Sequence, residues 1–276
     1  MPKALSVAQV DQFRRDGWLS PVPLLTAEEA LVLRRKLEDL EAAIGAEAQG
    51  RFKIKAHLPF PWLSGLIRDP RLLDVVEDLL GPDLVVWGSS FFTKAARDRR
   101  YFSWHQDSTY IGIEPPETIN VWIAFSRARR DSGCMRVIPG SHRGPAIMPH
   151  VETFDPDNLL SRGQTIEGVD ESGAVFMELD PGECSIHHNK LIHSSEPNPS
   201  NDARIGFAVH FAPAHCRQVQ FAGATGTLVR GADRHGHWRP EPVPARDLDP
   251  VCLAALDAAW AQYRTGMRPM AASAQK

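Results

Sequence analysis

The sequence has few cysteines, no strong net charge and no long hydrophobic run, and each absence excludes a class of protein. The four cysteines lie far apart among 276 residues without a Cys-x-x-Cys pair, which argues against a structural zinc site or a redox motif. A formal net charge of -3 gives no electrostatic reason to expect nucleic acid or an anionic membrane as a partner. No segment has the length of a membrane span, and the N-terminus lacks the apolar stretch of a signal peptide. We therefore expect reduced thiols, no nucleic acid or membrane partner, and a cytoplasmic location.

The composition is that of a globular protein with a sizeable core, because 43% of the residues are hydrophobic and 24% are charged. A chain of this length needs no second domain, so we expect one domain spanning residues 1–276. Helix signals fill its first part, about residues 5–81. Ser6 and Thr26 each precede Gln or Glu by three positions, which is the capping-box spacing that starts a helix. We expect the second of these helices to continue through about Leu40.

From residue 84 the pattern changes to short apolar or alternating runs separated by Gly, Pro, Asp and Asn, which is typical of an antiparallel β domain. Eight candidate strands cover residues 84–94, 102–107, 118–126, 134–138, 174–179, 184–187, 191–194 and 204–212. We therefore expect a mainly β protein with N-terminal helices and a cupin-like jelly-roll core of about residues 84–213. The poorly patterned segment 143–173 is long for a connection and is a candidate lid. A C-terminal extension, 214–276, should be extended and irregular over residues 222–249 and then helical over about residues 250–263.

His105 and Asp107 lie one residue apart, the spacing that places two side chains on one face of a β-strand. An imidazole and a carboxylate on one face can hold a metal ion together, and His193 is the best candidate for a third ligand. Two histidines and one carboxylate leave the opposite coordination positions free, as in a non-haem Fe(II) oxygenase. A lone His-x-Asp also arises by chance, and His187 and His188 compete with His193 for the third position.

Arg204 opens an apolar strand eleven residues after His193, across a turn-forming loop of residues 196–202. If that loop is a hairpin, Arg204 returns beside the strand of His193. Its planar guanidinium suits a carboxylate, to which Ser195 can add a hydrogen bond, and Gly206 on the same face leaves room for a ligand. The alternative is that Arg204 pairs with an acidic neighbour at a sheet edge.

Together, these residues and the motifs between them resemble the phytanoyl-CoA dioxygenase family of Fe(II)- and 2-oxoglutarate-dependent oxygenases. The resemblance extends from about Leu5 to Pro213. It rests on ordered blocks at residues 105–107, 120–125, 133–142, 181–183, 188–195 and 204.

The resemblance implies a double-stranded β-helix in which His105, Asp107 and His193 hold Fe(II). It further implies that Arg204 and Ser195 bind the distal carboxylate of the cosubstrate 2-oxoglutarate, which is consumed together with O2, and that Trp122 and Phe102 line the same pocket. The bound iron would then hydroxylate a C–H bond of a small molecule, with release of succinate and CO2.

The carboxylate at position 107 bears on the reaction type. Related aliphatic halogenases carry a small residue there, so Asp107 favours hydroxylation or a reaction that begins in the same way, such as demethylation or desaturation. The family pattern also places a histidine that is not a ligand at the position of His188, which we expect to be a core residue. We expect His210 to be structural, and His235 and His237 to lie in a solvated loop.

The substrate is less defined than the cosubstrate. Lys94, Gln106 and Tyr110 lie near the metal motif in sequence and could contact an anionic or polar group, although Lys94 could equally pair with a surface acid. No dedicated coenzyme A site is evident. Two other hypotheses stay open: a non-catalytic, metal-binding jelly roll that binds a ligand, and a metal-dependent hydrolase or isomerase, which would have no use for Arg204. The chain could act as a monomer or a homodimer.

Overall fold

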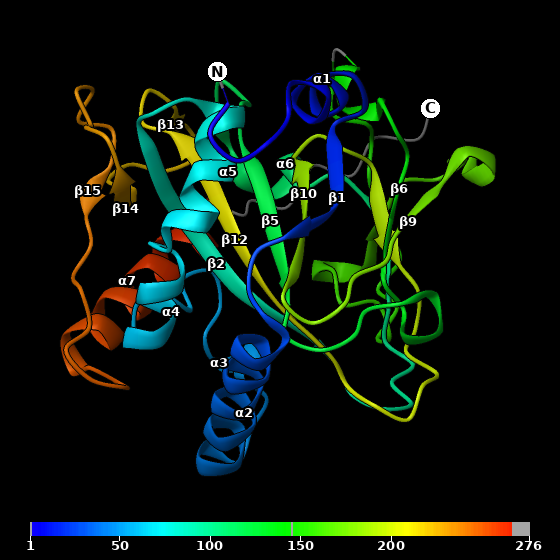
Figure 1. Ribbon diagram of the computed structural model, residues 1–276, viewed down its shortest axis with the longest axis horizontal. Helices are drawn as coiled ribbons and strands as arrows, with labels where there is room; N and C mark the ends of the chain where they lie inside the picture. The colour runs from blue at the N-terminus through cyan, green and yellow to red at the C-terminus, as the bar shows by residue number, and fades with distance from the viewer. Residues whose placement is uncertain (1, 145, 267–276) are drawn as a thin grey trace.

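The computed structural model describes residues 2–144 and 146–266 as two sheets that face each other (Figure 1). The large sheet contains, in spatial order, β1 (Trp18–Pro23), β10 (Glu183–His188), β5 (Ile119–Ala124), β12 (Arg204–Pro213), β2 (Leu84–Lys94), β14 (Thr225–Arg230) and β15 (Arg239–Pro240). The small sheet contains β3 (Phe102–His105), β11 (His193–Ser195), β6 (Met135–Val137) and β9 (Val175–Met177). Two short pairs join β13 (Arg217–Gln218) to β4 (Ile113–Glu114) and β7 (Val151–Glu152) to β8 (Gln164–Thr165). Facing, largely antiparallel sheets agree with the predicted jelly roll.

All eight strands expected in the core are present, but the large sheet extends beyond that core. β1 comes from the helical N-terminal part and pairs with β10. β14 comes from residues 222–249, which we expected to be irregular, and it pairs with β2. The segment is extended, as expected, but part of it is a regular strand, because Gly226 lets β14 approach Val85 where a side chain would collide with it. The segments before residue 84 and after residue 213 therefore each add a strand to the large sheet.

The helices begin where their capping residues predict. Ser6 starts α1 (Val7–Asp16) and Thr26 starts α2 (Ala27–Ile44), each with a complete capping box. α2 is four residues longer than expected because its end is set by Gly45, which takes a left-handed conformation with φ of 64°. The remaining helices are α3 (Ala48–Arg51), α4 (Pro61–Leu66), α5 (Pro70–Leu80), α6 (Ser108–Ile111) and α7 (Pro250–Gly266), with 3₁₀ turns η1 (Arg130–Ser132), η2 (Ser141–Arg143), η3 (Ser161–Gly163) and η4 (Glu171–Gly173). Among the described helices, none is long and apolar enough to cross a membrane.

Side chains along the central strands point alternately to the two faces of the large sheet, and this divides the molecule into layers. On β12, Phe207 and Val209 belong to the main hydrophobic core, which they share with Leu72 and Val76 of α5. The opposite face of β12 looks toward the small sheet, and there Ala208 packs in a separate, smaller cluster. Helices thus cover one face of the large sheet, where α4 and α5 lie over it (Figure 1). The other face is left to the small sheet, so its polar side chains are free to build a site between the sheets.

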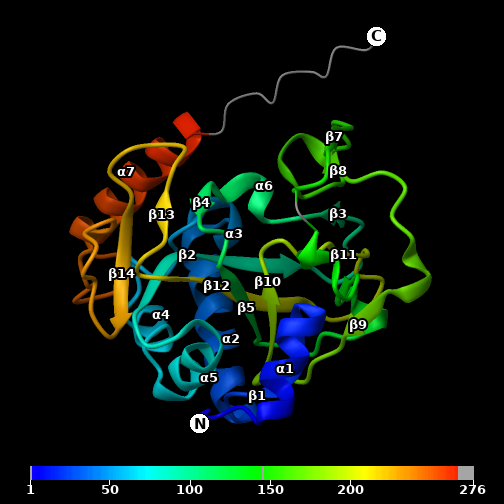
Figure 2. The ribbon, with the colours of Figure 1, turned by 90° about the horizontal axis from the view of Figure 1, so that it is seen from above.

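The long segment of residues 146–173 is docked against β3 rather than free. The Ser103 hydroxyl donates to Gln164 O at 2.6 Å, and Ile166 N donates to Trp104 O at 2.8 Å. Leu159 N also donates to Tyr101 O at 2.8 Å. Figure 2 shows β7 and β8 of this segment beside β3, on the opposite side of the molecule from α7 and β14. The segment therefore forms a wall beside the small sheet, and its opening as a lid stays a prediction.

Candidate active site

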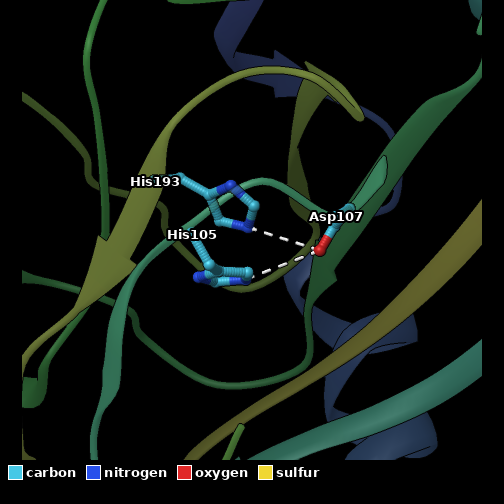
Figure 3. A group of neighbouring side chains, drawn as sticks. All are labelled: His105, Asp107 and His193. Carbon is cyan, nitrogen blue, oxygen red and sulfur yellow. Dashed lines mark ion pairs between the residues drawn. The ribbon is translucent and has the colours of Figure 1, made fainter. Parts of the chain in front are cut away.

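Three side chains that are far apart in the sequence converge between the two sheets. His105 lies at the end of β3, His193 begins β11, and these residues are paired neighbours in the small sheet. Oδ1 of Asp107 lies 3.5 Å from Nε2 of His105 and 3.7 Å from Nε2 of His193 (Figure 3). One ligand atom from each of the three residues lies within 4.8 Å of the others, which is compact enough for all three to reach one metal ion.

Asp107 does not share a strand with His105, contrary to our expectation. β3 ends at His105, and Asp107 has α-helical backbone angles, with φ of -56° and ψ of -35°, immediately before α6. The carboxylate therefore reaches the histidines because the chain turns, and not because side chains alternate along a strand. The spacing correctly predicted that the two residues are close, but the expected strand geometry was wrong.

Backbone carbonyls fix the orientation of both imidazoles. Nδ1 of His105 lies 2.8 Å from Ser103 O, and Nδ1 of His193 lies 2.9 Å from Leu191 O. A carbonyl oxygen only accepts, so each Nδ1 carries the proton and each Nε2 presents a lone pair. Burial also lowers the pKa of His193 well below its usual value, which keeps this imidazole neutral. Two lone pairs and a carboxylate oxygen therefore point at one place, which is a donor set that suits a divalent metal ion.

The second oxygen of Asp107 is held by two residues that the sequence did not single out as part of the site. Oδ2 lies 3.3 Å from Nε2 of His187 and accepts a long hydrogen bond of 3.4 Å from Asn120. His187 and Asn120 are paired on adjacent strands β10 and β5, so both face the small sheet. Burial alone would raise the pKa of Asp107, but the contacts of the carboxylate with the imidazoles of His193, His105 and His187 hold it well below its usual range. Along β10, polar side chains occur at every second position, Ser185 and His187. This pattern was the signal that could have placed His187 on the face that carries the site.

Arg204 is a buried cation without a carboxylate partner in the described part of the chain. Its side chain reaches across from β12, where Nη1 donates to Gly133 O at 2.9 Å and to the Ser195 hydroxyl at 3.2 Å. Its Nε atom is buried and has no hydrogen-bond partner. The guanidinium lies 5.3 Å from the centre of the Trp122 ring. Burial lowers the pKa of Arg204 to about 10, so the group stays charged near neutral pH and requires an anion that the protein does not supply.

The route by which Arg204 reaches Ser195 differs from the expected hairpin. β11 and β12 lie in different sheets, so the loop between them crosses from the small sheet to the large one, and the two side chains meet across the gap. The space above Gly206 is also not free for a ligand. A Cβ atom at this position would overlap the Trp122 ring, which packs directly on the glycine. Both expectations were wrong because local spacing does not say which sheet a strand will join.

Two adjoining cavities meet at His105 and Asp107. The smaller one is lined by His105, Asp107, His193, Arg204, Ser195, Trp122 and Phe102, together with Asn120, His187, Phe92, Met135 and Ser194. This brings all residues expected to hold iron or 2-oxoglutarate around one space. The larger cavity, of about 670 Å³, shares His105, Asp107, Phe92 and Phe102 with the first and extends toward α7. Tyr110, expected to contact substrate, lines this larger cavity, as does His210, which we expected to be purely structural.

Lys94 and Gln106 line neither cavity, so their positions do not support the expected contact with substrate. Lys94 is fully buried behind Ser195, where its Nζ atom donates to Ser195 O at 3.1 Å and also to the Ser195 hydroxyl and to Glu196 O. Burial, with the nearby charge of Arg204, lowers the pKa of Lys94 to about 6. The Gln106 side chain instead donates to Lys190 O at 2.7 Å and accepts from Met148 N at 2.7 Å, which fastens the 146–173 segment.

The remaining histidines lie outside the site. His188 is partly buried and accepts a hydrogen bond of 3.0 Å from Lys190 N at its Nδ1 atom. His235 and His237 are exposed, as expected of a solvated loop. His215 joins Glu117 and Cys216 in a second group with metal-binding side-chain types. Burial raises the pKa of the Cys216 thiol to about 12, which disfavours the thiolate that binds metals.

Comparison with known proteins identifies relatives of this chain by sequence. A sequence profile described as phytanoyl-CoA dioxygenase (PhyH) matches residues 13–206. The peroxisomal phytanoyl-CoA dioxygenase of Bos taurus is 29% identical over 163 residues, which are 56% of this chain and 48% of that protein. The chain therefore matches about half of the length of that relative.

Two solved structures are similar over most of the chain. The apo structure of ThoJ, described as a non-heme monooxygenase, has a TM-score of 0.80 and 32% identity, covering 93% of this chain and 96% of that one. CytC3 with Fe(II) and alpha-ketoglutarate, a synonym of 2-oxoglutarate, has a TM-score of 0.66 and 27% identity, covering 90% and 97%. The cupin-like jelly roll expected from the sequence is thus confirmed. With a profile match across most of its length, the chain belongs to the phytanoyl-CoA dioxygenase family.

Proposed function

We propose that this chain is an Fe(II)- and 2-oxoglutarate-dependent dioxygenase that hydroxylates an unactivated C–H bond of a small molecule. One atom of O2 would enter the substrate as a hydroxyl group, and the other would enter succinate, formed from 2-oxoglutarate with loss of CO2. Demethylation and desaturation begin with the same attack on a C–H bond and are variants of this proposal. Cytoplasmic location and a monomeric or homodimeric state stay predictions.

The observation that carries the proposal is the convergence of two neutral imidazoles and one carboxylate on a single point. With both Nδ1 protons donated to backbone carbonyls, no proton lies between Nε2 of His105, Nε2 of His193 and Oδ1 of Asp107. Electron pairs that face each other this closely repel, so a bound cation would stabilise the arrangement. Two histidines and one carboxylate with open positions are the ligand set of non-haem Fe(II) oxygenases.

The cosubstrate proposal is supported by the unpaired charge of Arg204. Its Nε atom is buried without a partner, and the smaller cavity connects it to the proposed iron ligands. A dicarboxylate such as 2-oxoglutarate could place one carboxylate against Arg204 and Ser195 and present its other end to the iron. The Trp122 and Phe102 rings would enclose the carbon chain between these ends and exclude water.

Bound iron would supply the oxidising chemistry, while the protein supplies binding, orientation and exclusion of water. His187 and Asn120 would keep Oδ2 of Asp107 turned away from the metal, so that Oδ1 faces it. Lys94 would hold the Ser195 hydroxyl in place from behind. None of these residues is required to transfer a proton to the substrate.

The two competing hypotheses explain fewer of these observations. A closed structural metal site would need a fourth protein ligand, whereas His187 is oriented toward Oδ2 of Asp107 and not toward the point where the three donors meet. A metal-dependent hydrolase would leave the buried charge of Arg204 unexplained.

Anaerobic spectroscopy tests the proposal directly. Addition of Fe(II) and 2-oxoglutarate to the intact protein should produce the weak visible charge-transfer band of an iron chelate of 2-oxoglutarate. Asp107→Ala and Arg204→Ala should lose the band, whereas Arg129→Ala, which removes only a surface ion pair with Asp180, should retain it. Absence of a band in the intact protein, or tight zinc binding without succinate formation over a panel of small acids, would favour the non-catalytic alternative.

A further inference from the structure

The larger cavity runs from the proposed iron ligands to α7 and has the dimensions of a substrate site. Its volume of about 670 Å³ falls within the range of about 300–1,000 Å³ common for small-molecule sites. Residues of α3, β2, the 146–173 segment and α7 contribute to its walls. α7 lies beyond residues 13–206, which match the family profile, so this wall is built by a part of the chain outside the matched region.

Aromatic rings dominate the walls of this cavity. They belong to Trp87, Phe92, Phe102, Tyr110, Trp260 and Tyr263. On α7, the rings of Trp260 and Tyr263 are stacked, with centroids 5.8 Å apart and planes inclined by 21°. The Tyr263 hydroxyl donates to Tyr110 O at 3.2 Å, which joins α7 to the chain beside the proposed iron ligands. Flat apolar surfaces at these positions favour a substrate that contains a ring.

The solvent end of the cavity carries two positive charges that no carboxylate of the described residues neutralises. Lys53 Nζ lies 5.2 Å and Arg264 Cζ lies 5.8 Å from the centre of the Trp260 ring, and both side chains are exposed. Neither forms an ion pair within residues 2–144 and 146–266, whereas Arg100 in the same cavity is paired with Glu47 at 2.9 Å. Two unpaired cations beside one indole form a site for an anion that is attached to a ring.

Polar atoms nearer to the proposed iron ligands also await a partner. The Tyr110 hydroxyl, Nε1 of Trp87 and Nδ1 of His210 are buried without a hydrogen-bond partner in the structure, and all three residues line the cavity. The Tyr110 ring lies 6.4 Å from the His105 ring, and the Trp87 and His210 rings are 4.9 Å apart. Buried polar atoms are normally satisfied, so these three indicate that the ligand also carries a polar group at its inner end.

We propose that the substrate is a small molecule that contains a ring and an anionic group, either a carboxylate or a phosphate. Lys53 and Arg264, at the end of the cavity formed by α7, recognise the anionic group. This inference deepens the proposed function and rests on it for the reaction at the inner end. The ring packs against Trp260 and Tyr263, its anionic group lies at the solvent end, and the carbon to be oxidised faces His105 and Asp107.

Calorimetry with four simple probes tests the recognition independently of turnover. Phenylacetate and phenyl phosphate carry a ring and an anion, phenylacetamide carries the ring alone, and hexanoate carries the anion alone. Binding is measured anaerobically with Fe(II) and 2-oxoglutarate present, and again with neither. We expect both phenyl anions to bind more tightly than phenylacetamide and hexanoate, and the tighter of the two identifies the anionic group.

Variants assign the binding to residues. Lys53→Ala combined with Arg264→Ala should weaken phenyl anion binding about tenfold and leave phenylacetamide binding unchanged. Arg51→Ala is the matched control, because Arg51 is paired with Asp257 at 3.5 Å and does not line the cavity.

The inference would be overturned by equal affinity for phenylacetate and phenylacetamide, by equal affinity for hexanoate and phenylacetate, or by a weakening in Arg51→Ala equal to that in the double variant. No binding of either phenyl anion at millimolar concentration would do the same. The proposed function fails separately, because it depends on the charge-transfer band. A protein without that band that still binds phenyl anions through Lys53 and Arg264 would retain the recognition site and lose the reaction.

Discussion

His187 lies with its Nε2 atom 3.3 Å from Oδ2 of Asp107, the carboxylate oxygen that does not face His105 and His193. The His187 side chain is fully buried, and its ring lies 4.6 Å from that of His193. Since Oδ2 can only accept, His187 donates from Nε2 and cannot offer that lone pair to a metal. Its position makes it an orienting residue for Asp107.

Replacement of His187 by Ala should therefore weaken metal binding without removing a ligand. We expect Fe(II) affinity to fall by about 10- to 100-fold, the range seen when a residue that orients a metal ligand is removed. Calorimetric titration with Fe(II) under anaerobic conditions measures this change. His188→Ala is the matched control, because His188 is bound to Lys190 N and should leave affinity unchanged. Equal losses of Fe(II) affinity in both variants would show that any such substitution on β10 weakens metal binding, and would contradict a specific role of His187.

Arg204→Lys should lose most of the affinity for 2-oxoglutarate while metal binding is retained. A lysine keeps the charge but cannot present the planar pair of donors that matches a carboxylate. We expect the Kd of 2-oxoglutarate to rise about tenfold in Arg204→Lys and about a hundredfold or more in Arg204→Ala. Titration of the charge-transfer band at fixed Fe(II) measures the value for Arg204→Lys, and calorimetric titration with 2-oxoglutarate measures that for Arg204→Ala, which should lose the band. An unchanged Kd in Arg204→Ala would place the cosubstrate elsewhere.

Gly206→Ala should displace the Trp122 ring. Because the added Cβ would overlap this ring, we expect a loss of about 1–3 kcal/mol in the free energy of unfolding, together with weaker 2-oxoglutarate binding. Urea unfolding measures the first effect. Gly65→Ala in α4 is the control, since nothing lies within 4 Å of the place that its Cβ would occupy, and it should not destabilise the protein. Combining Gly206→Ala with Trp122→Leu should restore part of the stability, and failure to do so would contradict the proposed overlap.

Glu241→Gln should weaken the attachment of the C-terminal part of the chain to the core. The Glu241 carboxylate is 1% exposed and lies 2.6 Å from Lys55 Nζ and 3.3 Å from Nε2 of His57. The amide would leave the buried Lys55 without its counter-ion. We expect the free energy of unfolding at pH 7 to fall by about 3–5 kcal/mol, measured with urea. Arg264→Ala, which removes an exposed and unpaired charge, should change it by less than about 0.5 kcal/mol.

The same carboxylate should give the protein a defined sensitivity to acid. Burial alone would raise the Glu241 pKa, but Lys55 and His57 hold it well below its usual range. A carboxyl whose pKa is lowered by folding stabilises the protein fully above its unfolded pKa of about 4.5 and progressively less as the pH falls below that value. The stability difference between the unmodified protein and Glu241→Gln should therefore narrow between pH 5 and pH 3. A difference that stays constant over this interval would show that folding does not lower the pKa of Glu241.

Much of the candidate site could be predicted from residue types and order along the chain. His105, Asp107, His193 and Arg204 were identified because their side chains are those that a metal and a dicarboxylate require, and the structure brings them together. The contribution of His187 was missed, since its role depends on which residue faces it across the gap. Lys94 was expected to contact the substrate because it is close to the metal motif in sequence. The neighbouring residues do not reveal that its side chain is buried behind Ser195.

The sequence by itself determined the alternation of side chains that separates a helix-covered face of the large sheet from a polar face. It also determined the capping of the first helices and the chemical identity of the metal-binding and anion-binding groups. These features depend on residues close together in the chain. Only the tertiary structure decided that β11 and β12 join different sheets, that Asp107 reaches the histidines from a turn, and that α7 walls the larger cavity. Each of these depends on the packing of segments far apart in sequence, and local propensity carries no information about that packing.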